Sequence, residues 1–195
     1  MITPVPTLET RRLILKRIEE SHLASYQKHF AHWEIIRNLA KAVPWPYPAD
    51  GAKQFYHSVI EPNQGKNRWT WGIFLKDDSD ELIGAIELFH MTGLENRGFW
   101  LAKDHWGKGL MPEAVIPVTD FAFGQLGFEK LQFGNAVGNE RSRRIKEKTG
   151  ARRIGTRPLE FADPTFTEIE LWEITKEQWI TFVKKIVTVQ PDSMS

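Results

Sequence analysis

The sequence predicts a single α/β or α+β domain built around a mixed sheet, and two observations carry this prediction. Strand-like runs and helical spacings alternate in the order β-α-α-β-β-β-α-β-α-β, with no Pro-, Gly- or Ser-rich linker between them. The 195 residues are also enough to bury one sizeable core. We therefore expect one domain over residues 1–195, with its core at about 7–187 and a flexible tail at 188–195.

The composition excludes several classes of function. Lys and Arg number 26 against 25 Asp and Glu, for a net charge of +1, whereas a dedicated nucleic-acid binder would carry a basic excess. Cysteine is absent, and the six histidines show no metal-ligand spacing. The N-terminus lacks a signal peptide, and no apolar run is long enough to cross a membrane. We expect a cytoplasmic protein with no metal ion, no membrane partner and no direct nucleic-acid partner.

The N-terminal half is predicted to hold three strands and three helical segments. The strand-like runs, rich in β-branched and aromatic residues, span 11–17, 69–75 and 82–90. The segments with apolar residues at helical spacing span about 21–33, 35–39 and 49–60. Between the last two helices, Pro44-Trp45-Pro46-Tyr47-Pro48 cannot form a helix interior. Residues 77–80 are the polar turn of a hairpin.

The C-terminal half continues the alternation. Its predicted strands span 98–102, 131–137 and 167–174. Its predicted helices span 112–126, 139–148 and 177–187. Asn139 is expected to cap the second of these helices and Gly150 to end it.

A glycine turn between the strand at 98–102 and the helix at 112–126 is the first candidate binding site. It reads Trp106-Gly107-Lys108-Gly109-Leu110-Met111. The first amides of a helix lack intrahelical partners, and the helix dipole adds positive potential there. Glycine also lets the backbone approach an anion closely. The turn therefore predicts a phosphate or pyrophosphate site to which Lys108 adds a charge, or else a plain strand–helix connection. It contains neither GxGxxG nor a P-loop.

Three segments, in the right order, resemble the GNAT acetyltransferase superfamily. The turn resembles its pyrophosphate loop, Gln/Arg-x-x-Gly-x-Gly/Ala, with Gly109 as the first motif glycine. The segment 139–150 resembles the Asn-x-x-Ser-x-x-x-x-x-Lys-x-Gly stretch of the RimJ/RimL branch, the ribosomal-protein N-terminal acetyltransferases. Residues 8–15 resemble the opening strand of that branch. The chain departs from it at Pro112, which replaces Thr, and at Asn96, which stands where many relatives carry an acidic residue.

This resemblance implies a GNAT fold and acetyl transfer from acetyl-CoA to a primary amine. The fold would have a mixed, mostly antiparallel sheet of about seven strands, helices on both faces, and a central strand pair that splays apart. The pantetheine arm would lie in the splayed gap, held by the backbone near Trp100 and Leu101 and by Asn139. The pyrophosphate would lie on the loop, whose residues are Trp106, Gly107, Lys108, Gly109, Leu110 and Met111.

The resemblance also implies two catalytic residues. Ser142 would protonate the departing thiolate, the alternative being a solvent-facing helix serine. Glu160 lies close to a glutamate that this branch is proposed to use as a base, the alternative being a solvated loop residue. Glu87, in an apolar strand, is the rival base or a buried structural carboxylate.

The expected acceptor is the α-amine of a protein or peptide, a ribosomal protein among them. At pH 7 an α-amine costs about 1 kcal/mol to deprotonate and a lysine about 4 to 5 kcal/mol, so a weak base or water suffices for an N-terminus. The alternatives are a small amine, such as a polyamine, aminoglycoside or amino acid, and a CoA-binding sensor that has lost catalysis. Reaction in a ternary complex is expected, by a monomer or homodimer.

Overall fold

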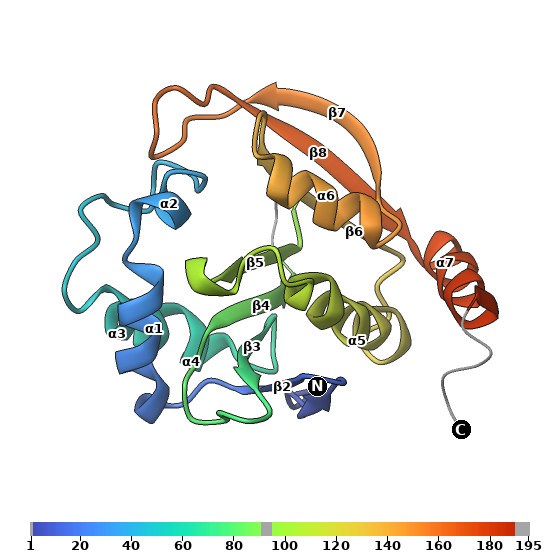
Figure 1. Cartoon of the computed structure of the whole chain (residues 1–195), viewed down its shortest axis with the longest axis horizontal. Helices are drawn as coiled ribbons and strands as arrows, with labels where there is room; N and C mark the ends of the chain where they lie inside the picture. Colours follow the sequence, from blue (N-terminus) through green and yellow to red (C-terminus); the bar gives the residue numbers. More distant parts are fainter. Residues whose placement is uncertain (1, 91–94, 190–195) are drawn as a thin grey trace.

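The chain forms two antiparallel sheets, seen in a computed structural model that describes residues 2–90 and 95–189. The larger sheet has the order β1-β2-β3-β4-β5 and the smaller one β6-β8-β7 (Figure 1). The strands of the larger sheet are β1 Leu8–Glu9, β2 Leu13–Arg17, β3 Arg68–Leu75, β4 Gly84–Phe89 and β5 Arg97–Leu101. Those of the smaller sheet are β6 Lys130–Ala136, β7 Arg152–Pro158 and β8 Glu168–Thr175.

Helices connect and cover these strands. The helices before β3 are α1 Leu23–Phe30, α2 Trp33–Ile36, α3 Gly51–Phe55 and α4 Glu61–Asn63. Those that follow are α5 Leu110–Gly124, α6 Glu140–Lys148 and α7 Lys176–Val189. A π-helical turn over Tyr56–Ile60 lies between α3 and α4, and 3₁₀ turns occupy Glu20–His22 and Lys103–His105.

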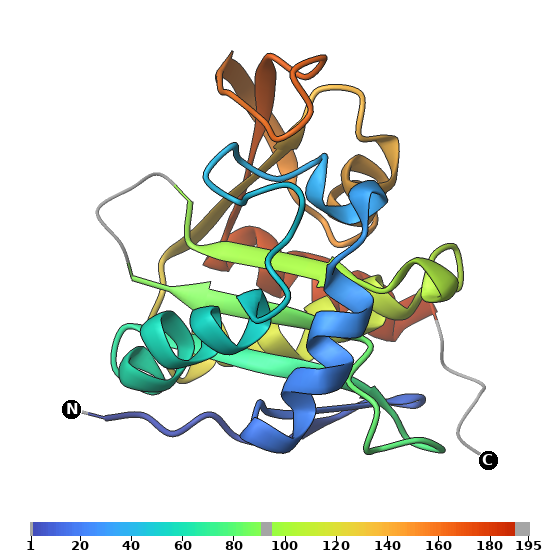
Figure 2. The same cartoon turned by 90° about the vertical axis from the view of Figure 1, so that its left-hand side faces the viewer.

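Along each strand of the larger sheet, successive side chains point to opposite faces, and both faces are buried. On β3, Trp71 and Ile73 belong to the core formed with α5. Phe74, their neighbour in sequence, belongs to a second core formed with α1 and α3. Figure 2 looks onto one face of the larger sheet, with α1 and α3 in front of it and α5 behind it. Helices therefore cover both faces, as the resemblance implied.

Two tryptophans tie the N-terminal segment to this core. Trp69 Nε1 donates to the carbonyl oxygen of Thr3 at 2.9 Å, and Trp71 Nε1 donates to that of Pro6 at 2.8 Å. Both indoles are buried, so they pack in the core. Trp45 is 46 % exposed and lies beside Trp33.

The strands β5 and β6 are joined at one end only. Asn96 donates from its backbone N to the Gln132 carbonyl oxygen at 2.9 Å, and its Oδ1 accepts from Gln132 N at 2.8 Å. Its Nδ2 donates to the carbonyl oxygen of Lys130 at 3.2 Å. In the described part of the chain β5 and β6 belong to different sheets beyond this point. The expected splayed strand pair is therefore present.

The predicted fold class is confirmed, and several details differ from expectation. The described residues form eight strands in two sheets, of which β7 and the short β1 were not expected as separate strands. The helix expected at 49–60 contains the π-helical turn and continues to Asn63. Helix α5 begins at Leu110, two residues earlier than expected. Helix α7 continues to Val189, which takes up the start of the expected tail, and residues 190–195 lie outside the described residues.

Asn96→Ala should lower the free energy of unfolding by about 1 kcal/mol, because the Gln132 amide loses its acceptor. Urea unfolding measures the change. Asn67→Ala, which removes the same amide from an exposed turn, is the matched control and should leave stability nearly unchanged. Equal stability of the two variants would contradict the bridging role of Asn96.

Candidate active site

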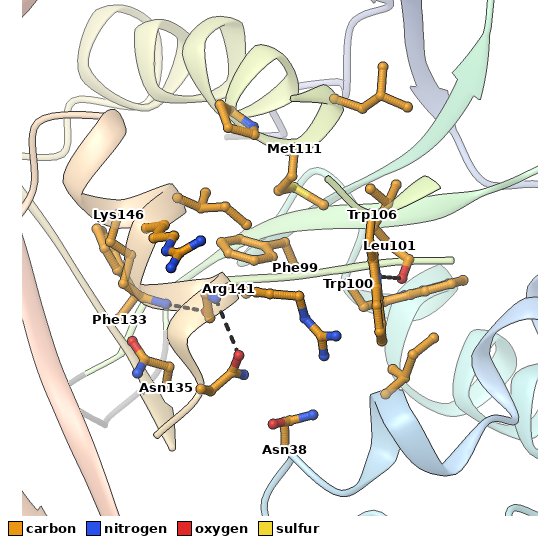
Figure 3. A pocket seen from close by; sticks show the side chains of 18 of the residues that line it. Asn38, Phe99, Trp100, Leu101, Trp106, Met111, Phe133, Asn135, Arg141 and Lys146 are labelled. Atoms are coloured by element: carbon orange, nitrogen blue, oxygen red, sulfur yellow. Dashed lines mark hydrogen bonds between the residues drawn. The ribbon is translucent and has the colours of Figure 1, made fainter. Parts of the chain in front are cut away.

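A cavity of about 370 Å³ lies between the diverging strands β5 and β6. The strand β5 contributes Phe99 and Leu101 to its lining, and α6 adds Ser142 and Lys146. The glycine turn and the start of α5 add Gly107 and residues 109–112. Figure 3 shows Lys146 and Phe133 on one side of this cavity and Trp106 and Leu101 on the other. The lining is partly aromatic and partly polar, so the cavity can accommodate a long ligand of mixed character.

The glycine turn reaches the cavity as a left-handed bend that opens α5. Gly107 has φ of 75° and Gly109 has φ of 73°, a region in which side chains other than glycine are strained. Gly109 is the N-cap of α5, so the first amides of that helix have no intrahelical acceptor. The positive end of α5 therefore lies at the cavity.

Arg12 and Glu113 anchor this turn to β1 and β2. Arg12 Nη1 donates to the Lys108 carbonyl oxygen at 3.0 Å, and its Nε donates to Glu113 Oε2 at 2.7 Å. Thr10 Oγ1 donates to Glu113 Oε1 at 2.6 Å. Burial alone would raise the pKa of Glu113, but the hydrogen bonds from Thr10 and Arg12 hold that pKa below its usual value. The carboxylate thus stays charged and the turn stays in place.

Trp106 closes one side of the cavity. Its Nε1 donates to the Leu101 carbonyl oxygen at 2.7 Å, and the Arg141 guanidinium lies over its ring at 3.4 Å from the centroid. The indole thereby links the end of β5 to the first turn of α6. The cation–π contact fixes one cavity wall where the two sheets have separated.

The register of β5 corrects one expectation. Ala102 N donates to the Ile83 carbonyl oxygen at 2.7 Å, which directs the backbone groups of Ala102 toward β4. Because backbone direction alternates along a strand, Trp100 also directs its groups toward β4, and Phe99 and Leu101 direct theirs toward the cavity. Trp100 was expected to hold a ligand through its backbone. In the structure it contributes its side chain to the lining instead.

Asn139 and Ser142 meet at the start of α6, on the cavity wall. Asn139 caps the helix, and its Oδ1 accepts from Ser142 N at 3.2 Å. The Ser142 hydroxyl accepts a hydrogen bond from Lys146 Nζ at 2.6 Å. Both residues line the cavity, so the structure brings them together where the motif implied.

Two buried cations at this cavity were not found by the sequence analysis. Lys146 is 1 % exposed and Arg97 is 4 % exposed. Burial and then repulsion from Arg97 lower the pKa of Lys146 well below the usual lysine value, and burial lowers the pKa of Arg97 to about 9. The Arg97 guanidinium lies 3.5 Å from the Phe133 ring centroid, and its Nε and Nη2 have no hydrogen-bond partner among the described residues.

Two other sequence candidates lie outside the cavity. The Glu160 side chain is 80 % exposed and pairs with Lys41 at 3.3 Å, and it lines neither of the cavities described here. Lys108 is exposed, and only its backbone is held, through the bond from Arg12. Neither side chain is in position to touch a group inside the cavity.

A second cavity, of about 540 Å³, lies on the other side of β5. Gly98, Phe99, Trp100 and Leu39 line both cavities. The remaining walls of the second cavity include six aromatic or proline side chains, which are Tyr26, Phe30, Pro44, Tyr47, Pro48 and Phe55. β5 is thus a wall shared by two adjoining spaces.

Glu87 is the only acidic residue among the described residues that line the second cavity. It forms an ion pair with Arg68, and Thr70 Oγ1 donates to its Oε2 at 3.4 Å. A Cβ atom added at Gly98 would stand 3.2 Å from Glu87 Oε1, so the carboxylate lies directly beside β5. The missing side chain of Gly98 leaves room for it there.

Residues 2–90 and 95–189 hold no group of three or more His, Cys, Asp or Glu arranged to bind a metal ion. In the same part of the chain, no helix is both long and apolar enough to span a membrane.

Residues 12–152 match the acetyltransferase (GNAT) domain family. The chain belongs to the GNAT family of acetyltransferases. This GNAT chain is 27% identical to the uncharacterized N-acetyltransferase YoaA of Bacillus subtilis over 176 residues, 88% of the chain and 97% of YoaA. It is 34% identical to the probable N-acetyltransferase YjcK of the same organism over 113 residues, 56% of the chain and 62% of YjcK. Family and relatives together identify an N-acetyltransferase.

Solved structures show the same GNAT fold. RimJ of Mycobacterium smegmatis, in complex with CoA-disulfide, has a TM-score of 0.77 at 16% identity and covers 94% of this chain and 93% of its own. The spermidine N-acetyltransferase of Vibrio cholerae, in complex with CoA and spermine, has a TM-score of 0.71 at 19% identity. The match covers 86% of this chain and 98% of that structure's chain. At these identities the likeness concerns the fold alone.

Lys146→Met should raise the free energy of unfolding by about 1 to 4 kcal/mol at pH 7, because it replaces a buried amine with an apolar side chain of similar length. The folded state lowers the pKa of Lys146, so the unfolded state binds more protons between the folded and unfolded pKa values. The stability of the parent should therefore rise with pH through that window, and the gain in the variant should shrink as pH rises.

Thermal unfolding from pH 6 to 10 checks this expectation. Arg143→Met is the matched control, because it removes a cation from the exposed side of the same helix. Its unfolding should show the same pH dependence as the parent. A Lys146→Met variant that is less stable than the parent, or whose gain grows with pH, would contradict the burial argument.

Proposed function

We propose that the cavity between β5 and β6 holds acetyl-CoA, and that the acceptor amine enters from the second cavity. The observation that carries the proposal is the meeting of three features in one gap: the α5 N-terminus, the open edge of β5 and the capped start of α6. These features suit a pyrophosphate, an amide-bearing arm and a thioester respectively. Acetyl-CoA carries the three groups in that order.

The glycine turn suits the pyrophosphate. A Cβ atom added at Gly107 would meet nothing within 4 Å, and one added at Gly109 would meet only Arg12 Nη2 at 3.6 Å. The turn therefore borders open space that a ligand can occupy. Pro112 removes one donor, but the amides of Leu110 and Met111 precede it and remain.

The open edge of β5 suits the pantetheine arm. The Leu101 carbonyl already accepts from Trp106, which leaves the backbone groups of Phe99 and the Leu101 amide to bind a ligand at this edge. The Asn139 side chain faces the same cavity from α6. We assign Phe99 and Asn139 to the two sides of the arm. The Phe99 amide would polarise the thioester carbonyl, as an oxyanion-hole donor does.

Ser142 is our proposed acid. The acceptor nitrogen attacks the carbonyl carbon, the carbon–sulfur bond breaks, and the Ser142 hydroxyl gives its proton to the sulfur. No enzyme nucleophile is needed, because the two cavities adjoin at Gly98 and Phe99 and the reactants can meet directly. A transfer within a ternary complex follows.

Glu87 is our proposed acceptor-side base, since it lies at the second cavity and Glu160 does not. A single carboxylate among aromatic walls suits an acceptor with one amine and an apolar neighbour. A polyamine carries several positive charges and would require more carboxylates than the described lining offers. We therefore propose the α-amine of a peptide or protein, ribosomal proteins included, as the acceptor.

A sensor without catalysis is less well supported. Its sequence arguments were Pro112 in the glycine turn and Asn96 in place of an acidic residue. Pro112 leaves the amides of Leu110 and Met111 in place, and Asn96 joins the two sheets through Gln132 and thereby has a structural role. A monomeric or homodimeric state and a cytoplasmic location stay predictions.

Acetyl-CoA should raise the melting temperature of the parent by mass action on the folded state, and Gly109→Glu should abolish that shift. Gly109→Ala is the matched control, because both variants carry the cost of a side chain at φ of 73° but only Glu adds a negative charge. The alanine variant should keep most of the shift. A glutamate variant that binds as tightly as alanine would contradict the phosphate assignment.

Peptides with a free N-terminus should be acetylated, and spermidine should react poorly, in a thiol-release assay. Glu87→Gln should slow the peptide reaction by less than about 100-fold, because roughly a tenth of an α-amine is already neutral at pH 7. The loss should shrink as pH rises. Glu160→Gln is the control and should turn over as the parent does. Efficient spermidine turnover beside inert peptides would overturn the proposed acceptor.

A further inference from the structure

We propose that Lys146 returns a proton to Ser142 during acetyl transfer, so that the two side chains form one proton relay on α6. The inference rests on the proposed function, because it requires Ser142 to protonate the thiolate. It adds a residue that no sequence motif pointed to, and it explains why a lysine is buried at this cavity.

The geometry favours a relay in one direction. Lys146 follows Ser142 by four residues, which places both side chains on the same face of α6. Lys146 Nζ donates to Ser142 Oγ at 2.6 Å, and both residues line the cavity (Figure 3). An ammonium group has donors only, so this contact fills a lone pair of the serine oxygen. The serine O–H is thereby left to point into the cavity, where the sulfur would lie.

The surroundings of Lys146 give it no purely structural partner of opposite charge. Phe99 and Phe133 flank the amine, with ring centroids 5.3 and 5.9 Å from Nζ. No ion pair joins Lys146 to a carboxylate of the described residues, and Ser142 is its side-chain hydrogen-bond partner there. Buried lysines are usually paired, because an isolated cation loses its hydration. Such a cation next to a proposed acid points to a role in proton transfer.

The charges that face Lys146 suit a proton donor. Arg97 on β5 disfavours the ammonium form, whereas Glu95 before β5 and Glu170 on β8 favour it. Burial is the largest influence, and the pKa of Lys146 lies below that of an ordinary lysine. Its ammonium is therefore a stronger acid than usual and is closer to a thiol, whose pKa is about 8.5 in cysteine. Proton transfer is most effective between groups matched in this way.

The step balances in atoms and electrons. A bond forms between the acceptor nitrogen and the carbonyl carbon, and the carbon–sulfur bond breaks with its electron pair going to sulfur. Ser142 Oγ–H passes its proton to the sulfur, and the Lys146 ammonium passes a proton to Ser142 Oγ. Lys146 is left as a neutral amine. The acceptor nitrogen loses one proton to Glu87 on becoming an amide. Glu87 then releases that proton to water, and Lys146 takes up one proton from water, so both side chains return to their starting states.

A double-mutant cycle tests the relay with Ser142→Ala, Lys146→Met and the double variant. The measurements are kcat and the KM of acetyl-CoA in the peptide thiol-release assay. Each single variant should lower kcat by roughly 10- to 1,000-fold and change KM much less. The double variant should be no slower than Ser142→Ala, because Lys146 acts only through that hydroxyl. Arg143→Met should turn over as the parent does.

A third variant, Lys146→Gln, separates proton transfer from positioning. Its side-chain amide can still donate a hydrogen bond to Ser142 Oγ, but it has no proton to give up. It should therefore be about as slow as Lys146→Met. The kcat of the parent should fall as pH rises through the pKa of Lys146, because the ammonium form is required. That decline should be absent from both lysine variants.

The outcomes distinguish the relay from the proposed function. A fast Lys146→Met or Lys146→Gln beside a slow Ser142→Ala would overturn the relay and leave acetyl transfer intact. Losses that multiply in the double variant would overturn it too, since the residues would then act independently. An unchanged Ser142→Ala would remove the acid and the relay together. A parent that neither binds nor turns over acetyl-CoA would instead refute the proposed function.

Discussion

The hydrogen bonds between Asn96 and Gln132 hold β5 and β6 together at one end, and the strands separate beyond it. A continuous ladder would have satisfied both edges with backbone partners and left no room between them. Because the ladder stops, the β5 edge keeps free hydrogen-bonding groups at Phe99. The gap also brings the start of α5 and the start of α6 to the same cavity. The candidate site depends on this local separation.

The strand β5 also lies between the proposed sites of the acetyl donor and the acceptor amine. One edge of β5 pairs with β4, and its residues from Gly98 to Trp100 form walls of both cavities. The Trp100 ring packs against Tyr26 and Phe30 at centroid distances of 4.9 and 5.1 Å, so that wall is rigid. An acetyl donor in one cavity and an amine in the other would be separated only by β5. This arrangement suits direct transfer, in which positioning contributes much of the rate.

Much of the fold followed from local signals in the sequence. The glycine turn and the Asn139 cap were found because each depends on residues close in sequence. A left-handed backbone favours glycine, and the first amides of a helix, which lack intrahelical acceptors, favour a capping side chain. The strand β7 was missed because its arginines, glycine and proline are mostly exposed and lack a strand-like pattern. The direction of the Trp100 backbone depends on the register with β4, which sequence alone does not fix.

Lys146 was missed, and Glu160 was expected at the site, for a related reason. Lys146 stands in a run of charged residues that looks like a solvated helix face, yet tertiary packing turns it toward Phe133. Glu160 matched a family position loosely, and the structure places it at the surface beside Lys41. Local patterns predict which residues cap helices and which form turns. Which charges are buried is decided by elements far apart in the sequence.

Hydrogen–deuterium exchange with and without CoA tests the central claim most directly, because it reports individual backbone amides. Our account predicts that CoA protects the amides at Phe99 and at 109–111 and slows exchange at the start of α6. The edge strand β1 and the strand β7 should exchange at the same rate in both states. Protection confined to other segments, or no protection at the glycine turn, would contradict the claim that the gap between β5 and β6 is the acetyl-CoA site.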